Sequence, residues 1–464
     1  MNEKLKLALN EISEQHIAEA AKNKSKRVIF LRIAAAAAAI AVIIGLFQLP
    51  RPILAKAVVT ASANRAPQRP NYDDYEDYND FKLDLNAWQT DDKARQDTVK
   101  AARADLSSFF TAGNTQFLSG SENAIWSPAN AWIGLAMAAE LVQGESRGQI
   151  LTALGADSMD ALRSQVSAVW ESVYRDNRQE ICTLANSLWL QKGLNYEKQT
   201  MDHLAHHHYA SVYQTNLQTA GGAIGAWLNN NTGGLLKDTI NIDLPEDTVL
   251  ALYSTLYFQS KWQNPFRSSN NREDVFHAPG GDKTVTYMTK KLSMMNYYWG
   301  DRFSAVSLGL KNGSTMWLIL PDEGLKPEDV LADGQYMDMI LANGWENKKM
   351  MKVNLSLPKF DITAKEDLSK GFIEMGITDV FSPGKADFSA ITADVPVFFT
   401  AANQAVRVQI DEEGVKAAAY IEFPGAGSPM PPDEIIDFVL DRPFLFVITN
   451  ENIPLFAGVV NNPG

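Results

Sequence analysis

Cysteine is almost absent from this sequence. Cys182 is the single one among 464 residues, so the chain can form neither an internal disulfide nor a cysteine-based metal cluster. Without disulfides, cysteine usage gives no information about the redox compartment of the protein. We expect Cys182 to be a buried structural thiol.

Positive charge is also in deficit. The sequence has 42 lysines and arginines against 55 aspartates and glutamates, which gives a formal net charge of -13. Proteins that bind nucleic acid need a basic surface facing the phosphates, and the second half of this chain has no basic stripe. We therefore expect no nucleic-acid partner. The 21% charged and 45% hydrophobic content is that of a globular protein.

Histidine is scarce as well, and four of the six histidines occur in one run, DHLAHHH. Helical spacing could place two of these imidazoles on one face as metal ligands, but the run has no acidic residue placed as in HExxH. A solvated helix end is the favoured alternative. The sequence also has no convincing GxSxG nucleophile motif, so we expect no enzyme, no metal and no cofactor. The histidines of this run are His203, His206, His207 and His208.

One long apolar run lies near the N-terminus, at residues 28–49, and its only charge is Arg32. About 20 such residues in a helix cross the hydrocarbon core of a bilayer. The preceding cationic residues favour a cytoplasmic tail at 1–27 and a cell-membrane, single-pass protein with an extracellular C-terminal part. The alternative is secretion after cleavage of a signal peptide at the small residues near Ala57. The cationic residues are Lys22, Lys24, Lys26 and Arg27.

Residues 50–97 are polar, contain prolines and aspartates, and include NYDDYEDYNDF. Acidic segments of this kind are usually solvated linkers. We expect an extracellular linker over 50–97, followed by one large domain over 98–464.

Helical and strand-like patterns mix without a regular βαβ spacing in this large domain. Ser127 and Pro128 are a plausible N-cap and first residue of a helix. Strand-like runs include ICTLANSLWL, DTVLALYSTLYF, TMWLILP, VRVQI and FLFVITN. The pattern predicts an α+β fold rather than a doubly wound one.

The stretch EEGVKAAAYIEFPGAGSPM begins as a strand and ends as a loop. From Val415 to Phe423 every second residue is apolar, which is the alternation of a strand with one buried face. The prolines and glycines that follow forbid further regular pairing. An ordinary edge strand before a surface loop is one interpretation of this stretch.

Several segments, in the same order over nearly all of 98–464, resemble the serpin family in its bacterial, membrane-anchored form. They include NAIWSPANAWIGLAMAAELVQGESRGQILTALG, DTVLALYSTLYFQSKWQNPF, LPKFDITAKEDLSKGFIEMGITDVFSPGKADFSAI, QIDEEGVKAAA and DRPFLFVITN. The resemblance implies three β-sheets, eight to nine helices and an exposed reactive loop. It further implies a suicide-type inhibitor of secreted or cell-surface serine or cysteine proteases, in which the cleaved loop inserts into the central sheet. A non-inhibitory serpin that acts as a displayed binding or chaperone-like module is the alternative.

By this resemblance, the loop begins with a hinge whose small and apolar residues suit insertion. The hinge residues are Glu412, Glu413, Gly414, Val415, Lys416, Ala417, Ala418 and Ala419. Candidates for the cleaved bond lie among Gly427, Ser428, Pro429 and Met430. A proline directly after the cut fits most proteases poorly, which favours the bonds after Gly427 and Pro429. Small residues here suit an elastase-like or subtilisin-like protease, and we expect the inhibitor to be a monomer.

Six further positions correspond to family residues that control the opening of the sheet: Ser127, Pro128, Asn186, Ser254, Trp262 and Gln404. Two of them depart from the family pattern, since Ser254 stands where an asparagine is usual and Gln404 where a histidine is usual. Either these two compensate each other by exchanging one buried hydrogen-bonded pair for another, or the sheet opens too readily or too slowly.

Overall fold

The computed structural model describes residues 57–64, 70, 72–176, 181–234, 242–311, 313–341, 345–415 and 432–464. The chain divides into two compact units, Met1–Lys56 and Ala57–Gly464, and every described residue belongs to the second. The predicted cytoplasmic tail and the predicted membrane helix at 28–49 lie outside the described residues. Within the described part, no helix is both long enough and apolar enough to cross a bilayer.

The α+β prediction is confirmed, because helices and strands alternate without a βαβ repeat. The helices are α5 (Tyr78–Phe117), α6 (Pro128–Leu141), α7 (Gly144–Leu154), α8 (Met159–Val173), α9 (Lys198–His207), α10 (Gly221–Asn231), α11 (Pro327–Asp333), α12 (Gln335–Leu341) and α13 (Ser369–Glu374). The first strands are β1 (Val58–Ala61), β2 (Ala124–Trp126), β3 (Arg175–Asp176), β4 (Ile181–Gln191), β5 (Ala210–Thr215), β6 (Leu250–Lys261), β7 (Arg272–Ala278), β8 (Gly281–Trp299) and β9 (Phe303–Gly309). They are followed by β10 (Thr315–Pro321), β11 (Lys348–Pro358), β12 (Phe360–Asp367), β13 (Asn403–Ile410), β14 (Gly414–Val415), β15 (Ile435–Val439), β16 (Phe444–Asn450) and β17 (Ile453–Val460).

The described strands form two sheets, so the expectation of three sheets is wrong. The second sheet runs β15-β11-β8-β9-β10-β16-β17-β2, with β7 on β8. Its continuity comes from β8, a strand of 19 residues. The first part of β8, up to Tyr287, pairs with β7; from Tyr287 to Tyr298 it pairs with β11, and from Tyr297 to Trp299 it pairs with β9 on its other edge. One long strand thereby joins two groups of strands that would otherwise be separate sheets.

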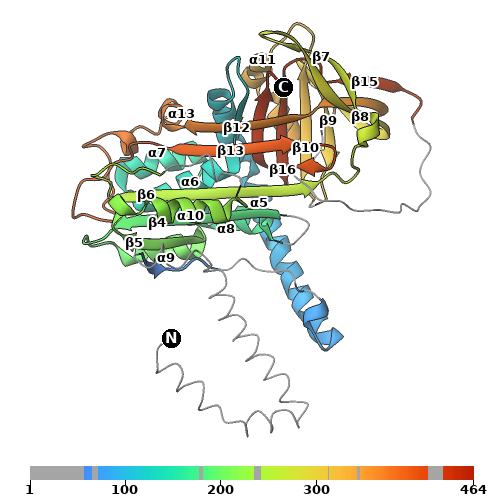
Figure 1. Cartoon of the computed structure of the whole chain (residues 1–464). Helices are drawn as coiled ribbons and strands as arrows, with labels where there is room; N and C mark the ends of the chain where they lie inside the picture. Colours follow the sequence, from blue (N-terminus) through green and yellow to red (C-terminus); the bar gives the residue numbers. More distant parts are fainter. Residues whose placement is uncertain are drawn as a thin grey trace. The chain divides into compact units, whose positions relative to one another are not determined.

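The first sheet has the order β1-β5-β4-β6-β14-β13-β12, and Figure 1 shows its longer strands β5, β4, β6, β13 and β12 in this sequence. Its strands β4 and β6 pair over ten residues, from Ile181 opposite Gln259 to Leu190 opposite Leu250. On the far side, β12 and β13 pair over eight residues. Between these two halves stands β14, which has only two residues. The centre of this sheet is therefore the place where its hydrogen-bond ladder is least complete.

Helix α6 packs between the two sheets because it is mostly apolar and has no exposed polar face. Of its 14 residues, only Gly134 is not buried, and a helix without a polar face must be covered on every side. It contacts β6 of the first sheet and β17 of the second. A second apolar cluster on the first sheet joins β4 and β5 to α10 and contains Trp189, Tyr213 and Trp227. The sheet is thus covered by α6 on one face and by α10 on the other.

The segment expected to be a linker contains regular structure. Strand β1 pairs with β5 at the edge of the first sheet, and α5 begins at Tyr78 with Asp77 as its N-cap. The range 50–97 therefore includes a strand of the sheet and half of a 40-residue helix. Cys182 is fully buried in β4, as expected, and burial raises the pKa of its thiol to about 12.

Candidate functional site

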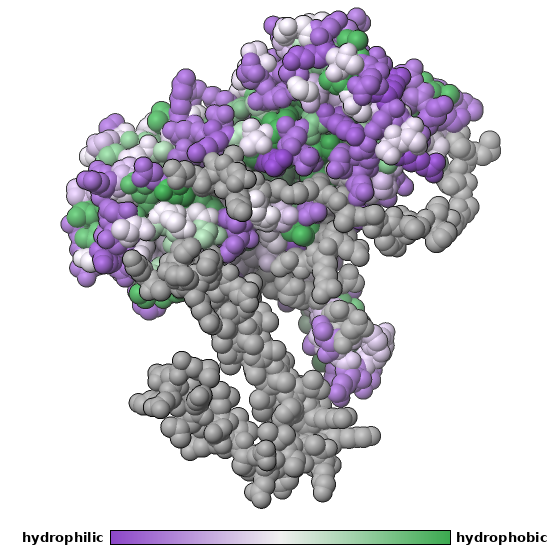
Figure 2. Space-filling view, in the orientation of Figure 1, coloured by the Kyte–Doolittle hydropathy of each residue, from purple (hydrophilic) through white to green (hydrophobic). Residues whose placement is uncertain are grey.

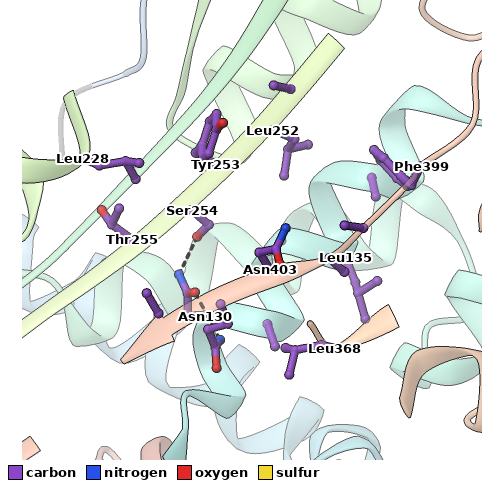
Figure 3. A pocket seen from close by; sticks show the side chains of 18 of the residues that line it. Asn130, Leu135, Leu228, Leu252, Tyr253, Ser254, Thr255, Leu368, Phe399 and Asn403 are labelled. Carbon is purple, nitrogen blue, oxygen red and sulfur yellow. Dashed lines mark hydrogen bonds between the residues drawn. The ribbon is translucent and has the colours of Figure 1, made fainter. Parts of the chain in front are cut away.

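The candidate site is the gap between β6 and β13. Within the described residues, both strands pair with β14 and not with each other. Where β14 ends, a cavity of about 880 Å³ lies against the sheet. Its lining is mainly apolar and includes Leu135 of α6, Leu252 of β6, Leu368 and Phe399 (Figure 3). The gap is therefore a mostly hydrophobic space bordered by two strands that do not pair with each other.

A polar network crosses this gap through Asn130 of α6. The Asn130 Nδ2 donates to Ser254 Oγ on β6 at 2.7 Å (Figure 3). From the other side, Gln404 Nε2 of β13 donates to Asn130 Oδ1 at 3.4 Å and to the Ser127 carbonyl at 3.1 Å. The Ser127 amide in turn donates to Gln404 Oε1 at 2.8 Å. Asn130 thus joins the two separated halves of the sheet to the helix between the sheets.

This geometry changes the expectation for Ser254 and Gln404. The two side chains do not exchange one hydrogen-bonded pair for another, because each bonds to Asn130 instead. Ser127 is the N-cap residue and Pro128 the first residue of α6, as predicted. The Ser127 hydroxyl makes no cap bond, however, and donates to the Leu455 carbonyl at 2.6 Å.

The end of the gap at which β14 lies is anchored around Trp262. This indole is 1% exposed, and its Nε1 donates to the Asp411 carbonyl at 2.9 Å. The Trp262 amide donates to the Glu413 carbonyl at 2.9 Å. Trp262 therefore fixes the chain just before β14 against the end of β6.

Glu412 is held at the same end by two partners. Its Oε1 lies 2.6 Å from Lys359 Nζ and accepts from Asn271 Nδ2 at 2.6 Å. Burial alone would raise the pKa of this carboxyl, but the bonds from Lys359 and Asn271 outweigh it and lower the pKa. Glu412 is thus a charged anchor that precedes the two-residue strand.

A buried ionic cluster is linked to β4, the strand that pairs with β6 on the side away from the gap. Asn186 on β4 is 2% exposed, lies opposite Ser254 in the ladder, and donates to the His208 carbonyl at 2.6 Å. The His208 imidazole is fully buried and its Nε2 lies 3.0 Å from Glu140 Oε1. Arg163 binds both oxygens of Glu140, at 2.7 and 2.8 Å. Desolvation would raise the pKa of Glu140, but Arg163 and His208 lower it to about 2.

This cluster also bears on the histidine run. The described residues contain no group of three His, Cys, Asp or Glu side chains placed to hold a metal. Arg163 Nη2 lies 2.8 Å from both Glu140 Oε2 and His203 Nδ1, which are themselves 3.6 Å apart. The expected solvated helix end describes the exposed His206, but it is wrong for His208, which is buried.

Comparison with known proteins identifies the architecture around this gap. Residues 109–463 match the protein-family model "Serpin (serine protease inhibitor)". The chain belongs to the serpin family. Its similarity to two alpha-1-antitrypsin-type proteins extends over most of each chain. The alpha-1-antitrypsin-like protein GS55-MS of Ictidomys tridecemlineatus is 29% identical over 74% of this serpin and 84% of that protein. The alpha-1-antiproteinase of Ovis aries is 27% identical over 81% of this serpin and 91% of that protein.

Solved serpin structures share the fold. The native state of tengpin, a thermophilic serpin, is 22% identical and superimposes with a TM-score of 0.71, covering 88% of this chain and all of that one. A thyroxine-binding globulin complex with thyroxine is 23% identical, with a TM-score of 0.65 and coverage of 77% and 99%. At this identity the likeness establishes the fold alone.

The structure brings most of the expected control residues of this serpin together. Around Asn130 lie four of them: Ser127, Pro128, Ser254 and Gln404. Asn186 lies on β4, the strand next to β6, and Trp262 lies at the end of the gap where β14 begins. Four hinge residues, Glu412 to Val415, are described, and Val415 is 4% exposed. The other hinge residues, 416–419, and the candidate bond residues, 427–430, lie outside the described residues.

The contributors not anticipated from the sequence are Asn130, Asn271 and Lys359 at the gap, and Glu140 and Arg163 in the buried cluster. Asn130 lies three residues after Ser127 on α6, so its position on a mostly apolar helix was a usable signal. Asn271 and Lys359 lie far from Glu412 in the chain, and nothing in their local sequence points to it.

Proposed function

We propose that this serpin inhibits serine proteases, and cysteine proteases as a second class, by inserting its cleaved loop between β6 and β13. The observation that carries this proposal is β14. Gly414 and Val415 already pair with Lys261 and Ser260 of β6, and Val415 pairs with Ile410 of β13. A strand that is hydrogen-bonded on both sides and ends after two residues is suited to be the start of a longer inserted strand.

The pairing of β14 also sets the register in which the rest of the loop would insert. Continued one residue at a time, it sets Ile421 opposite Ser254 on β6 and opposite Gln404 on β13. Residues opposite each other in an antiparallel ladder point to the same face. Ser254 faces α6, since it bonds to Asn130. The apolar series from Val415 to Phe423 would then point into the cavity, and Lys416, Tyr420 and Glu422 toward α10.

This role needs no catalytic residue in the inhibitor. The target protease supplies the nucleophile and forms an acyl-enzyme with the cleaved loop. Insertion would then carry the protease along and distort its active site before the ester is hydrolysed. Burial of each Val, Ile or Phe side chain of the loop would contribute roughly 1.5–3 kcal/mol, in addition to the new backbone hydrogen bonds.

The proposed targets are elastase-like or subtilisin-like proteases. The small residues Ala426, Gly427 and Ser428 fit a shallow specificity pocket, and no lysine or arginine lies between Lys416 and Pro432 to suit a trypsin-like one. We further propose a monomer on the outer side of a cell membrane, held by residues 28–49, with secretion after cleavage near Ala57 as the alternative. Because β1 begins at Val58, the tether would shorten to residues 50–57.

The test is to mix residues 57–464 with an elastase and with a subtilisin and to search for an SDS-stable complex. We expect a covalent band, a released C-terminal peptide that begins at the cleaved bond, and a higher thermal stability of the cleaved inhibitor. The same proteases with the catalytic serine changed to alanine are the control and should give no band. Cleavage without a covalent complex and without a gain in thermal stability would refute the proposal and favour the non-inhibitory alternative.

A further inference from the structure

A surface of unusual charge lies beside the end of the loop, on three neighbouring strands of the second sheet. Strand β15 pairs in parallel with β11, and β11 pairs with β8. Three lysines on these strands share one face, which we call the lysine shelf: Lys291 of β8 with Lys348 and Lys352 of β11. Figure 1 places β8 and β15 at the same end of the described fold, and Figure 2 shows a largely hydrophilic surface over this end with small hydrophobic spots.

The register determines which side chains share this face. Lys291 is the partner of Asn354 on β11, and Lys352 precedes Asn354 by two residues, so the two lysines point the same way. Val353, between them in the alternation, is 1% exposed and faces the core. Ile435 of β15 is paired with Lys352 and is 61% exposed.

The shelf is cationic in a protein with a net charge of -13. No described carboxylate lies within ion-pair distance of Lys291, Lys348 or Lys352, whereas the neighbouring Lys349 is paired with Glu434 at 2.6 Å. The carboxylate of Asp437 on the same face accepts from Asn354 at 2.7 Å. The apolar side chain of Met350, 43% exposed, lies between Lys348 and Lys352. Three unpaired lysines thus outnumber the one carboxylate on this face, and exposed apolar side chains within a surface of net positive charge are typical of a site that meets a partner of the opposite charge.

Chain length ties this surface to the bound protease. Ser428 is seven positions before Ile435 and Met430 is five positions before it, so the extended chain spans at most about 25 and 18 Å between these pairs. A compact protease of about 250 residues has a radius of gyration of about 18 Å. A protease engaged at any of the candidate bonds is therefore near enough to contact the shelf.

We propose that the lysine shelf is a second contact surface for the target protease, one that selects enzymes whose active-site rim is acidic. This inference rests on the proposed protease inhibition and adds a determinant outside the loop. Electrostatic attraction between such surfaces acts mainly on the association rate and is weakened by salt. Among proteases that accept the same small loop residues, the three lysines would thus raise the association rate of those with an acidic rim.

The probe is one subtilisin-type protease in two versions, with exposed residues beside the active-site cleft changed to aspartate in one and to lysine in the other. At low salt, the unmodified inhibitor should react roughly tenfold faster with the aspartate version. The double variant Lys348→Glu and Lys352→Glu should lose or invert this preference, and both differences should shrink at 1 M salt. The matched control, Lys198→Glu with Lys370→Glu, changes the net charge equally on the distant helices α9 and α13.

Equal rates with both protease versions, or an equal effect of the control pair, would overturn the shelf proposal. A parallel binding measurement uses the same two proteases with the catalytic serine changed to alanine. It reports the shelf contact even when no covalent complex forms. A rim preference without a covalent complex would therefore refute loop insertion and retain the shelf, and the opposite pattern would do the reverse.

Discussion

Gly414 lies against Ser260 so closely that no larger residue fits between them. A Cβ at position 414 would be 2.4 Å from the Ser260 carbonyl oxygen and 2.6 Å from the Cα of Lys261. The φ of Gly414 is +149°, a value that side-chain-bearing residues rarely adopt. The glycine thus lets the chain enter the sheet directly beside β6.

Gly414→Ala should lower the free energy of unfolding by about 1–3 kcal/mol, the usual cost of a strained backbone position. It should also reduce the yield of covalent complex, because β14 would be displaced from the start of the gap. Urea unfolding and gel analysis measure the two effects. Gly280→Ala is the control, since Gly280 has open space around its Cβ position. An unchanged stability of Gly414→Ala would contradict the close contact.

The Asn130 network predicts an energetic coupling between α6 and β6. Asn130→Ala removes the bond to Ser254 and leaves Gln404 with one partner fewer, which should cost about 1–3 kcal/mol of unfolding free energy. In a double-mutant cycle, Asn130→Ala and Ser254→Ala should be non-additive by at least about 0.5 kcal/mol. Additive effects would show that the hydrogen bond between them carries no stability.

Acid should destabilise this serpin through Glu140. Its pKa in the folded protein is about 2, below the ordinary value of about 4.3 for an unfolded chain, so the unfolded state binds a proton more readily. The stabilisation is complete above about pH 5 and is lost as the pH falls toward 2; its size is on the order of 3 kcal/mol. Glu140→Gln should flatten this part of the stability profile, whereas Glu323→Gln, at an exposed side chain, should leave it unchanged. The measurement is urea unfolding between pH 2 and pH 7.

The sequence predicted the buried elements of the first sheet well, since β4, β6 and β13 carry apolar runs or alternation that a core requires. The prediction failed where the local sequence pattern of a segment does not indicate its place in the folded domain. Strand β1 has four residues, too few for a periodic signal, and the first half of α5 is mostly exposed and acidic. Its composition is therefore that of a linker although its backbone is helical. The sequence likewise did not indicate that β8 is one strand of 19 residues that joins two groups of strands.

The sequence indicated several residues of the candidate site but not the hydrogen bonds between them. The family pattern indicated Ser254 and Gln404, but the partner that joins them lies 124 residues from one and 274 from the other. Hydrogen bonds over such separations depend on how α6 packs between the sheets. A single sequence carries no direct signal of that packing.

The register of β14 makes a prediction that distinguishes neighbouring loop residues. Ile421, set opposite Ser254 and Gln404, should enter the apolar cavity, while Tyr420 should face α10. Ile421→Arg would then place an unpaired guanidinium among Leu252, Leu135 and Phe399, at a cost of about 3–5 kcal/mol. At about 1.4 kcal/mol per tenfold, that cost lowers the ratio of trapped to released protease at least a hundredfold.

Tyr420→Arg is the matched control, because the same side chain one residue earlier would keep its charge on the α10 side. We expect Ile421→Arg to be cleaved as a substrate and Tyr420→Arg to remain an inhibitor, as measured by the moles of inhibitor consumed per mole of protease trapped. The opposite result would mean that the loop inserts one residue out of the register that β14 sets, since a shift of one residue exchanges the two faces of a strand. Equal inhibition by both variants would mean that insertion does not extend as far as Ser254.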